Sequence, residues 1–192
     1  TFVKSSSAST MLIDRTWLAV THHDRPDWPD CLDALRDARA RAIRMEISHL
    51  AHAATRGISI IHDEYLNAPD RAIEEIAKSE TELGTSPILQ DERATILYHH
   101  KKYGEALDIW QRVLAKSDPT SDAYDITIWT HRNAGVSAAM LGKWSLAATL
   151  FAQGSNRAGG TGIGWATAGL LADAAYAHWR AGEHGQLVRA LR

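Results

Sequence analysis

The chain is poor in cysteine, in charge of one sign and in long apolar runs. A single cysteine, Cys31, occurs among 192 residues, which excludes an internal disulfide framework and any zinc or iron–sulfur site built from several cysteines. The formal net charge is −2, so the chain lacks the basic field that recruits nucleic acid or acidic lipid. No stretch approaches the roughly 20 apolar residues that cross a bilayer. These absences favour a cytoplasmic protein that binds neither nucleic acid nor membranes.

Three stretches share one pattern, in which a small or polar turn precedes the start of a new apolar run. They are residues 102–106, 142–147 and 181–184. Such turns join two antiparallel helices, and their recurrence predicts an array of helical repeats. Arrays of this kind usually present a concave surface to a partner rather than a catalytic pocket. The pattern therefore favours a binding module over an enzyme.

Apolar residues with helical spacing support this interpretation. A helix is expected over residues 105–116, and the helix before it begins with Ser86 as its N-cap and Pro87 at its first position. Residues 29–56 form another helical stretch, either one long helix or two helices with an unmarked joint. No strand alternation is strong enough to indicate a sheet, so the predicted fold is all-α. The apolar stripe of the 105–116 helix consists of Ala106, Leu107, Trp110, Val113 and Leu114.

The small residues that open the second helices set the spacing of the repeats. Ala72, Ala106, Ala147 and Leu187 are separated by 34, 41 and 40 residues. The first interval equals the period of one known repeat class, and the other two imply insertions of about seven and six residues. We expect these insertions as loops at residues 117–125 and in the Gly-rich stretch 155–164.

From about Ala53 to its end, the chain resembles the tetratricopeptide repeats. The best match runs from Asn133 to Trp144 and continues with Ala147 and Phe151. The resemblance implies a right-handed α-solenoid of antiparallel helix pairs, preceded by an N-terminal helical segment at residues 1–52. The repeats would span about 53–86, 87–127, 128–164 and 165–192, the last of them truncated, in a fragment of a larger protein. One unit departs from the family's pattern, with Asn67 at the turn glycine and Pro69 at the inter-helix aromatic position.

The ten histidines invite comparison with metal sites. Glu46 and His49 have the Glu-x-x-His spacing of half a di-iron site, which would place them on one face of a helix. No second such motif occurs, and His52 is rotated partly away from that face. The adjacent pairs at residues 22–23 and 99–100 point in different directions on a helix. We therefore expect no metal site, no cofactor and no catalytic residue.

Three further motifs have a structural interpretation. The glycines of residues 159–164 are not followed by the Lys and Ser/Thr that end a P-loop, because Trp165 occupies the lysine position, so a flexible connection is expected. Cys31 falls on an apolar helical face and is expected to be a buried, inert thiol. The arginines between residues 36 and 44 alternate with two aspartates, which indicates a solvated face with ion pairs rather than an RNA-binding patch.

Tryptophan and arginine supply the candidate binding residues. Trp110 and Trp144 fall on core positions of the repeats and are expected to hold helices together. In the family, the first helices line a groove, and an asparagine at the position of Asn133 often hydrogen-bonds a peptide backbone. Exposed aromatic and arginine side chains are also the usual anchors of an interface. The predicted groove consists of Trp129, Arg132, Asn133, Val136, Tyr176, Trp179 and Arg180.

The expected function is non-catalytic binding of a protein or peptide in this groove, as an interaction, scaffold or sensor domain. The family's clamp of basic residues around a C-terminal carboxylate is not reproduced, because Asp91 and Asp173 stand at two of its positions. A basic ligand or a non-terminal segment is easier to accommodate. The alternatives are the helical sensor region of a signal-transducing P-loop NTPase, a histidine-rich metal-dependent enzyme, and a structural spacer or self-associating surface.

Overall fold

The computed structural model describes residues 27–116, 124–162 and 164–190, which form helices and turns without a strand. The predicted all-α class is confirmed for this part of the chain. Contacts divide the chain into two compact units, residues 1–92 and 93–192. Residues 1–26 of the predicted N-terminal helical segment, which include the 22–23 histidine pair, and most of the expected insertion at 117–125 lie outside the described residues.

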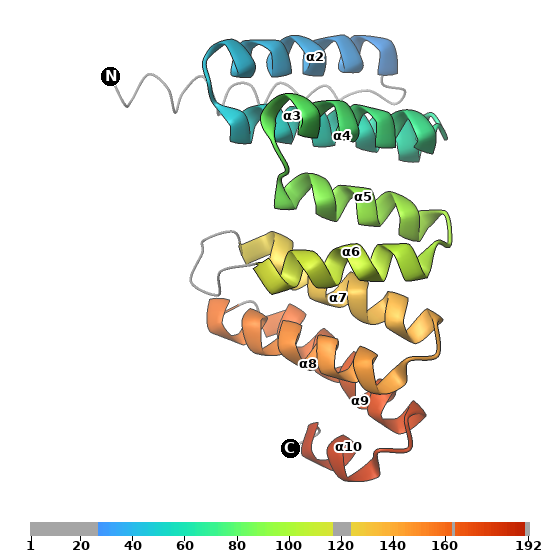
Figure 1. Cartoon of the computed structure of the whole chain (residues 1–192). Coiled ribbons are helices and arrows are strands. Elements are labelled where there is room, and N and C mark those ends of the chain that lie inside the picture. The colour runs from blue at the N-terminus through green and yellow to red at the C-terminus, as the bar shows by residue number, and fades with distance from the viewer. Residues whose placement is uncertain (1–26, 117–123, 163, 191–192) are drawn as a thin grey trace. The chain divides into compact units, whose positions relative to one another are not determined.

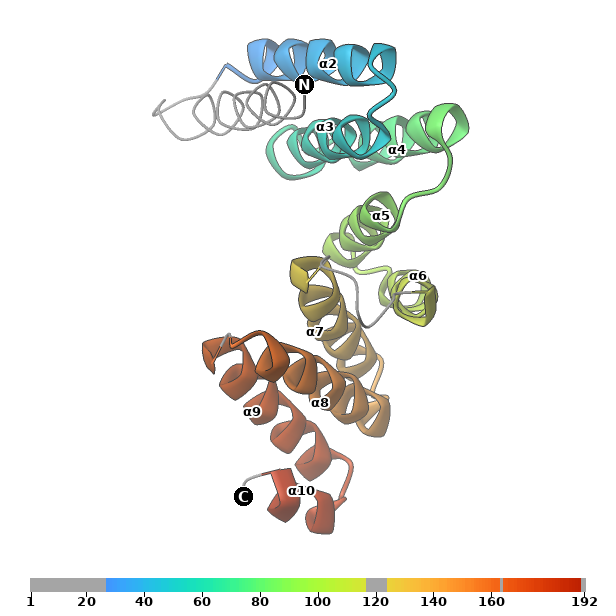
Figure 2. The same ribbon diagram turned by 90° about the vertical axis from the view of Figure 1, so that its left-hand side faces the viewer.

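The described part of the first unit is a stack of helices in which α2 packs on α3 and α3 packs on α4 (Figures 1 and 2). A short π-helical segment extends α3, and the unit ends within α5. The bounds are Trp28–Arg44 for α2, Ser48–Ile60 for α3, Ile61–Tyr65 for the π-helical segment, Pro69–Leu83 for α4 and Pro87–His99 for α5.

The stretch from residue 29 to residue 56 forms two helices joined at residues 45–47. Glu46 adopts φ +57°, a left-handed conformation that stops a helix. Because Glu46 lies in this turn and not on α3, it does not share a helix face with His49. The interpretation of these two residues as a helical Glu-x-x-His motif is therefore wrong.

Apolar and ionic contacts hold α2 on its neighbours. Cys31 is buried beside a cluster of leucine, isoleucine and alanine side chains from α2 and α3, and burial raises the pKa of its thiol. Arg39 is also buried, and its guanidinium reaches the carboxylates of Glu75 and Glu82 on α4 at 3.4 and 2.7 Å. The solvent-exposed ion pairs predicted for residues 36–44 are also present. Arg36 pairs with Asp33 at 3.2 Å, and Arg41 pairs with Asp37 at 2.6 Å.

In the second unit, each of the helices from α6 to α10 packs on the next one along the chain (Figure 1). Trp110 of α6 is fully buried, and its ring centroid lies 6.0 Å from that of Tyr98 on α5. Its predicted core role is confirmed. The bounds are Tyr103–Lys116 for α6, Tyr124–Met140 for α7, Trp144–Thr161 for α8, Gly164–Arg180 for α9 and His184–Ala190 for α10.

One type of turn recurs between these helices. At each such turn, a backbone N–H just past the helix end donates to the carbonyl five residues before it. The residue directly before the donor has positive φ, as in the Schellman C-cap. The three predicted turns have this geometry, and the joint between α2 and α3 is a fourth. The donors Ile47, Lys102, Lys143 and Glu183 bond the carbonyls of Ala42, Leu97, Ala138 and His178 at 2.9, 2.9, 2.8 and 2.9 Å, and the left-handed residues are Glu46, Lys101, Gly142 and Gly182.

The Gly-rich stretch after residue 155 is helical, contrary to the predicted loop. Helix α8 continues through Gly159 and Gly160 to Thr161 and ends at Gly162, which has φ +75°. Ala158 is fully buried, and Ser155 donates to the carbonyl of Thr167 on α9 at 3.1 Å. This packing stabilises the last turns of α8 enough to outweigh the roughly 1 kcal/mol that each glycine costs in a helix.

Candidate partner-binding cleft

A cleft of about 610 Å³ lies within the second unit, between α7 and α9. Its volume is typical of sites that hold a ligand or a few side chains of a partner. Two of the seven predicted groove residues, Trp129 and Arg132, line it. The full lining is Ile128, Trp129 and Arg132 from α7, with Trp165, Ala166, Gly169, Leu170, Ala172 and Asp173 from α9.

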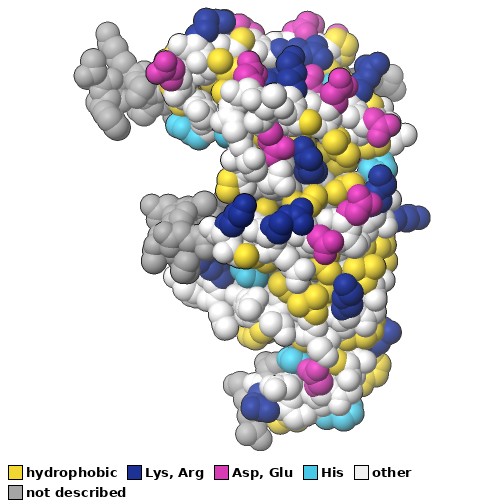
Figure 3. Space-filling view, viewed as in Figure 1, with side chains coloured by type: hydrophobic (Ala, Val, Ile, Leu, Met, Phe, Trp, Pro, Cys, Tyr) yellow, Lys and Arg dark blue, Asp and Glu magenta, His cyan; other side chains and the backbone are white. Residues whose placement is uncertain are grey.

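One end of the cleft is aromatic. Trp129 and Trp165 are 42% and 69% exposed, and their ring centroids lie 5.8 Å apart at an interplanar angle of 41°. Solvent exposure of two large rings on opposite walls is costly in water and is typical of surfaces that a partner covers. Hydrophobic side chains are visible at the surface of this unit among Lys and Arg side chains (Figure 3).

The cleft also holds one charge of each sign. The guanidinium of Arg132 lies 5.9 Å from the centroid of the Trp129 ring, and the half-buried Asp173 lies on the α9 wall. Within the described residues, neither side chain forms an ion pair. In an apolar cleft, these two ionic groups would gain free energy from partner groups of opposite charge.

Helix α8 positions the two walls through a glycine. A Cβ added at Gly154 would lie 2.9 Å from the Cβ of His131 on α7 and 3.3 Å from a methyl of Leu170 on α9. Both helices therefore approach the α8 backbone as closely as sterics allow. His131 Nδ1 lies 2.6 Å from the carbonyl oxygen of Thr127, and burial lowers the pKa of His131. The close packing of α7 and α9 on α8 therefore fixes the positions of the two walls.

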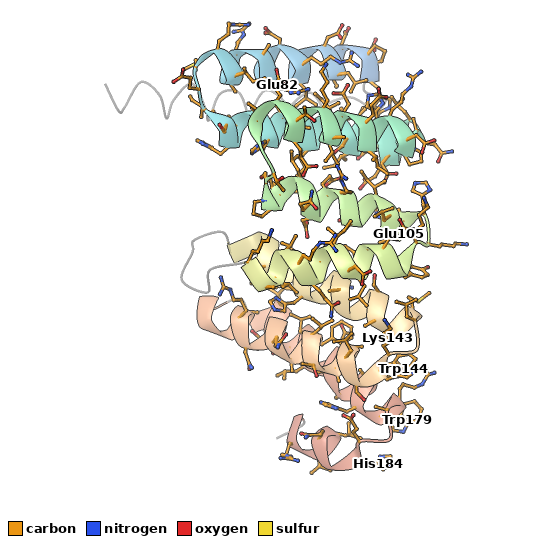
Figure 4. All side chains as sticks on the ribbon, in the orientation of Figure 1. Glu82, Glu105, Lys143, Trp144, Trp179 and His184 are labelled. Atoms are coloured by element: carbon orange, nitrogen blue, oxygen red, sulfur yellow. The ribbon has the colours of Figure 1, made fainter. Side chains whose placement is uncertain are left out.

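Three more of the predicted residues gather at the C-terminal end of α9, around Trp144. The Arg180 guanidinium lies 4.0 Å from the Trp144 ring centroid and donates to the Tyr176 hydroxyl at 2.9 Å. Tyr176 and Trp179 are 50% and 55% exposed. Trp144 is only half-buried, so it joins α8 to α9 at the surface rather than in the core as predicted. Figure 4 shows Trp144 and Trp179 on the same edge of this unit as His184.

A polar network fixes the turn beside this cluster. Glu183 accepts from Ser145 Oγ at 2.6 Å and lies 2.7 Å from His178 Nδ1. The hydrogen bond from Ser145, followed by that from His178, lowers the pKa of Glu183. These contacts join the start of α8 to the end of α9, so they hold the Trp144 cluster in place.

The remaining predicted residues, Asn133 and Val136, are half-buried on α7 and do not line the cleft. Sequence reasoning missed Trp165 as a site residue, since it was compared only with the lysine of a P-loop. A tryptophan directly after a helix-starting glycine is a signal that could have identified it. Asp173 was noted only as a departure from the family's basic clamp.

Buried ionisable groups of the first unit are separate from the cleft. Glu92 is 3% exposed and accepts from Arg56 Nε at 3.1 Å, while burial raises the pKa of Glu92 to about 7 against the opposing effect of Arg56. Burial also lowers the pKa of His52 and of His62. In the described part of the chain, no group of three or more His, Cys, Asp or Glu side chains could hold a metal ion.

Comparisons with known proteins give no assignment for this site. None of the helices in the described residues has the length and apolar character needed to cross a membrane. No protein-family model matches the chain, and no curated protein matches its sequence.

Proposed function

We propose that the second unit is a non-catalytic binding module that takes a protein or peptide partner in the cleft between α7 and α9. The observation that carries the proposal is the combination of two exposed tryptophans with Arg132 and Asp173 in one cleft of about 610 Å³. Tryptophan and arginine are the residues most enriched among interface hot spots. A peptide segment would cover the rings and pair both charges.

The repeat architecture supports this function. We infer that α3 with α4, α5 with α6, α7 with α8 and α9 with α10 are antiparallel pairs of tetratricopeptide-like repeats in a right-handed solenoid. The recurrence of one C-capping turn at three of the connections expected from the repeats supports the pairing. In such an array the first helices line the concave surface, and α7 and α9 are both first helices.

The chemistry of the lining favours binding over catalysis. Its side chains include one carboxylate and one guanidinium, and the other seven residues are apolar or glycine. A nucleophile next to a base, or two carboxylates of contrasting environment, would be expected in a hydrolytic site. The cleft offers anchoring contacts and charge selection instead.

A capture experiment tests the proposal. The immobilised chain is exposed to a lysate of the source cells, and captured proteins are quantified against an Arg132→Ala/Trp165→Ala variant. Both residues are exposed, so the variant should keep the helicity of the parent. Loss of two hot spots of about 2 kcal/mol each should reduce capture of a true partner by at least tenfold.

The matched control replaces two exposed side chains of α8, in Thr149→Ala/Gln153→Ala. Retention by this control together with loss by the cleft variant supports the proposal. Equal capture by the parent and the cleft variant would contradict the proposed function and would favour the hypothesis that the chain is a structural spacer. An Arg132→Ala/Asn133→Ala variant then shows whether Asn133 contributes from its half-buried position.

A further inference from the structure

The exposed face of α9 has the spacing of a helix-packing seam. Trp165, Gly169, Ala172, Tyr176 and Trp179 follow one another at alternating steps of four and three residues, and all are exposed. Alternating steps of four and three place residues along one face of a helix, as the a and d positions do in a coiled coil. No described helix covers this stripe along its length, because its large members stay about half exposed or more.

Two exposed residues of α7 lie opposite the start of this stripe. Trp129 is 42% exposed, and Arg132, three residues later, is exposed as well. Trp129 faces Trp165 across the cleft. The groove is therefore the cleft already described, between these two residues and the first part of the α9 stripe, and the α9 stripe continues beyond it to Tyr176 and Trp179.

The middle of the groove is open because its residues are small. Gly169 has no atom within 4 Å of the position that a Cβ would take, and its neighbour in the stripe is Ala172. Small residues at such a seam allow a second backbone to approach closely. The large rings of Trp165 and Trp179, at the two ends of the α9 stripe, are 14 residues apart, which is about 21 Å along the helix, and they flank the approaching element.

The scarcity of polar groups selects between an extended and a helical occupant. An extended peptide leaves its amide and carbonyl groups for the groove to satisfy. The side chains that line the cleft offer only Arg132, Asp173 and two indole N–H groups, and the Tyr176 hydroxyl beyond it already accepts from Arg180. An α-helix satisfies its own backbone and presents an apolar face. We propose that the groove binds an amphipathic α-helix of about four turns from a partner protein, an inference that rests on the proposed function.

The charges of the groove define the flanks of that helix. Arg132 lies on the α7 wall and Asp173 on the α9 wall, and neither forms an ion pair within the described residues. The bound helix carries an acidic side chain next to Arg132 and a basic side chain next to Asp173, with leucine-like residues between them. Charge pairing of this kind fixes the orientation of a helix in a groove more than it adds affinity.

The test uses a synthetic amphipathic peptide of about 18 residues, or five turns. Its leucines occupy heptad positions, and one Glu and one Lys flank them on opposite sides. A second peptide has the same composition with two central residues replaced by proline, which prevents helix formation. Binding is followed by fluorescence anisotropy of the labelled peptides, and circular dichroism reports helix gained on binding. The helical peptide is expected to bind at least about tenfold more tightly.

Substitutions in the protein locate the binding and test the charge assignment. Ala172→Arg places a long side chain in the middle of the groove and should abolish binding, while Asn156→Arg, on the exposed surface of α8, should leave it unchanged. Arg132→Glu should weaken binding by about tenfold. A peptide in which Lys replaces the Glu should bind the Arg132→Glu variant almost as tightly as the original peptide binds the parent. The same peptide should bind the parent protein more weakly.

Each outcome supports or overturns the helix proposal. Equal binding of both peptides, with loss of both in Ala172→Arg, would show that the groove takes extended segments. Failure of the helical peptide to bind at about 1 mM would also overturn the proposal. The proposed function is tested separately by the capture experiment, which uses no designed peptide. A dimer of the chain that Ala172→Arg dissociates would assign the groove to a second copy and would overturn the partner helix.

Discussion

Replacement of Gly135 by alanine sets two known energies against each other. Gly135 lies within α7, where alanine is favoured over glycine by about 1 kcal/mol. A Cβ at this position would, however, lie 2.6, 2.7 and 2.9 Å from three ring atoms of Phe151 on α8. Phe151 is 5% exposed, so its ring has little space into which it can move.

Overpacking of this kind costs about 1–3 kcal/mol. Because the propensity gain offsets only part of that cost, Gly135→Ala should lower the free energy of unfolding by roughly 1 kcal/mol. Gly169→Ala in α9 is the matched control, since a Cβ there meets nothing within 4 Å. It should raise the free energy of unfolding by about 1 kcal/mol.

Urea unfolding followed by far-UV circular dichroism measures both values under one set of conditions. The expected difference between the two variants is about 2 kcal/mol. In a Phe151→Leu background, Gly135→Ala should cost less, since the smaller side chain relieves the clash. If Gly135→Ala proved as stable as Gly169→Ala, the close packing of α7 on α8 and the reasoning from it would be refuted.

Three further variants test other parts of the structure. Trp110→Ala should lower the free energy of unfolding by about 3–5 kcal/mol because the side chain is fully buried, and a loss below about 1 kcal/mol in urea unfolding would contradict its core role. Lys101→Gly should raise the midpoint of thermal unfolding, since a left-handed residue with φ +63° costs about 1 kcal/mol for lysine and almost nothing for glycine; a lowered midpoint would show that the lysine side chain matters more than the backbone. The raised pKa of Glu92, from 4.5 to about 7, gives stability that is present below pH 4.5 and is lost as pH rises through 7, so the parent should lose roughly 3 kcal/mol over this range relative to Glu92→Gln. Parallel pH profiles of the two proteins would exclude a buried, protonated Glu92.

The elements that could be predicted from sequence are those in which local and tertiary preferences agree. Trp110 lies on a regular apolar stripe with a turn before it, so its helix and its burial follow from spacing. The joint at Glu46 carries neither glycine nor proline, and its left-handed conformation is set by packing rather than by local preference. The last turns of α8 contain glycines that indicate a loop locally, but contacts of Ser155 and Ala158 make them helical.

The candidate site could be predicted only in part, for a geometric reason. The resemblance to tetratricopeptide repeats places Trp129 and Arg132 on the groove side of one helix, and in the structure the Arg132 guanidinium lies 5.9 Å from the centroid of the Trp129 ring. Helical periodicity gives the face of a single helix on which a residue lies. It does not give the distance between two helices that are separated by a third. Whether Tyr176 lines the α7–α9 cleft or lies against Trp144 depends on how α8 packs between those two helices.

Helix α8 also determines the rotation between the walls of the cleft. Phe151 packs on α7, and Ser155, one turn later, bonds α9. Each residue turns a helix by about 100°, so one residue inserted between these two positions would rotate the α9-facing surface by more than a quarter turn relative to the α7-facing one. An insertion of seven residues, by contrast, restores the phase to within about 20°. The spacing between the α7-facing and the α9-facing residues of α8 therefore determines which side chains of α9 face Arg132.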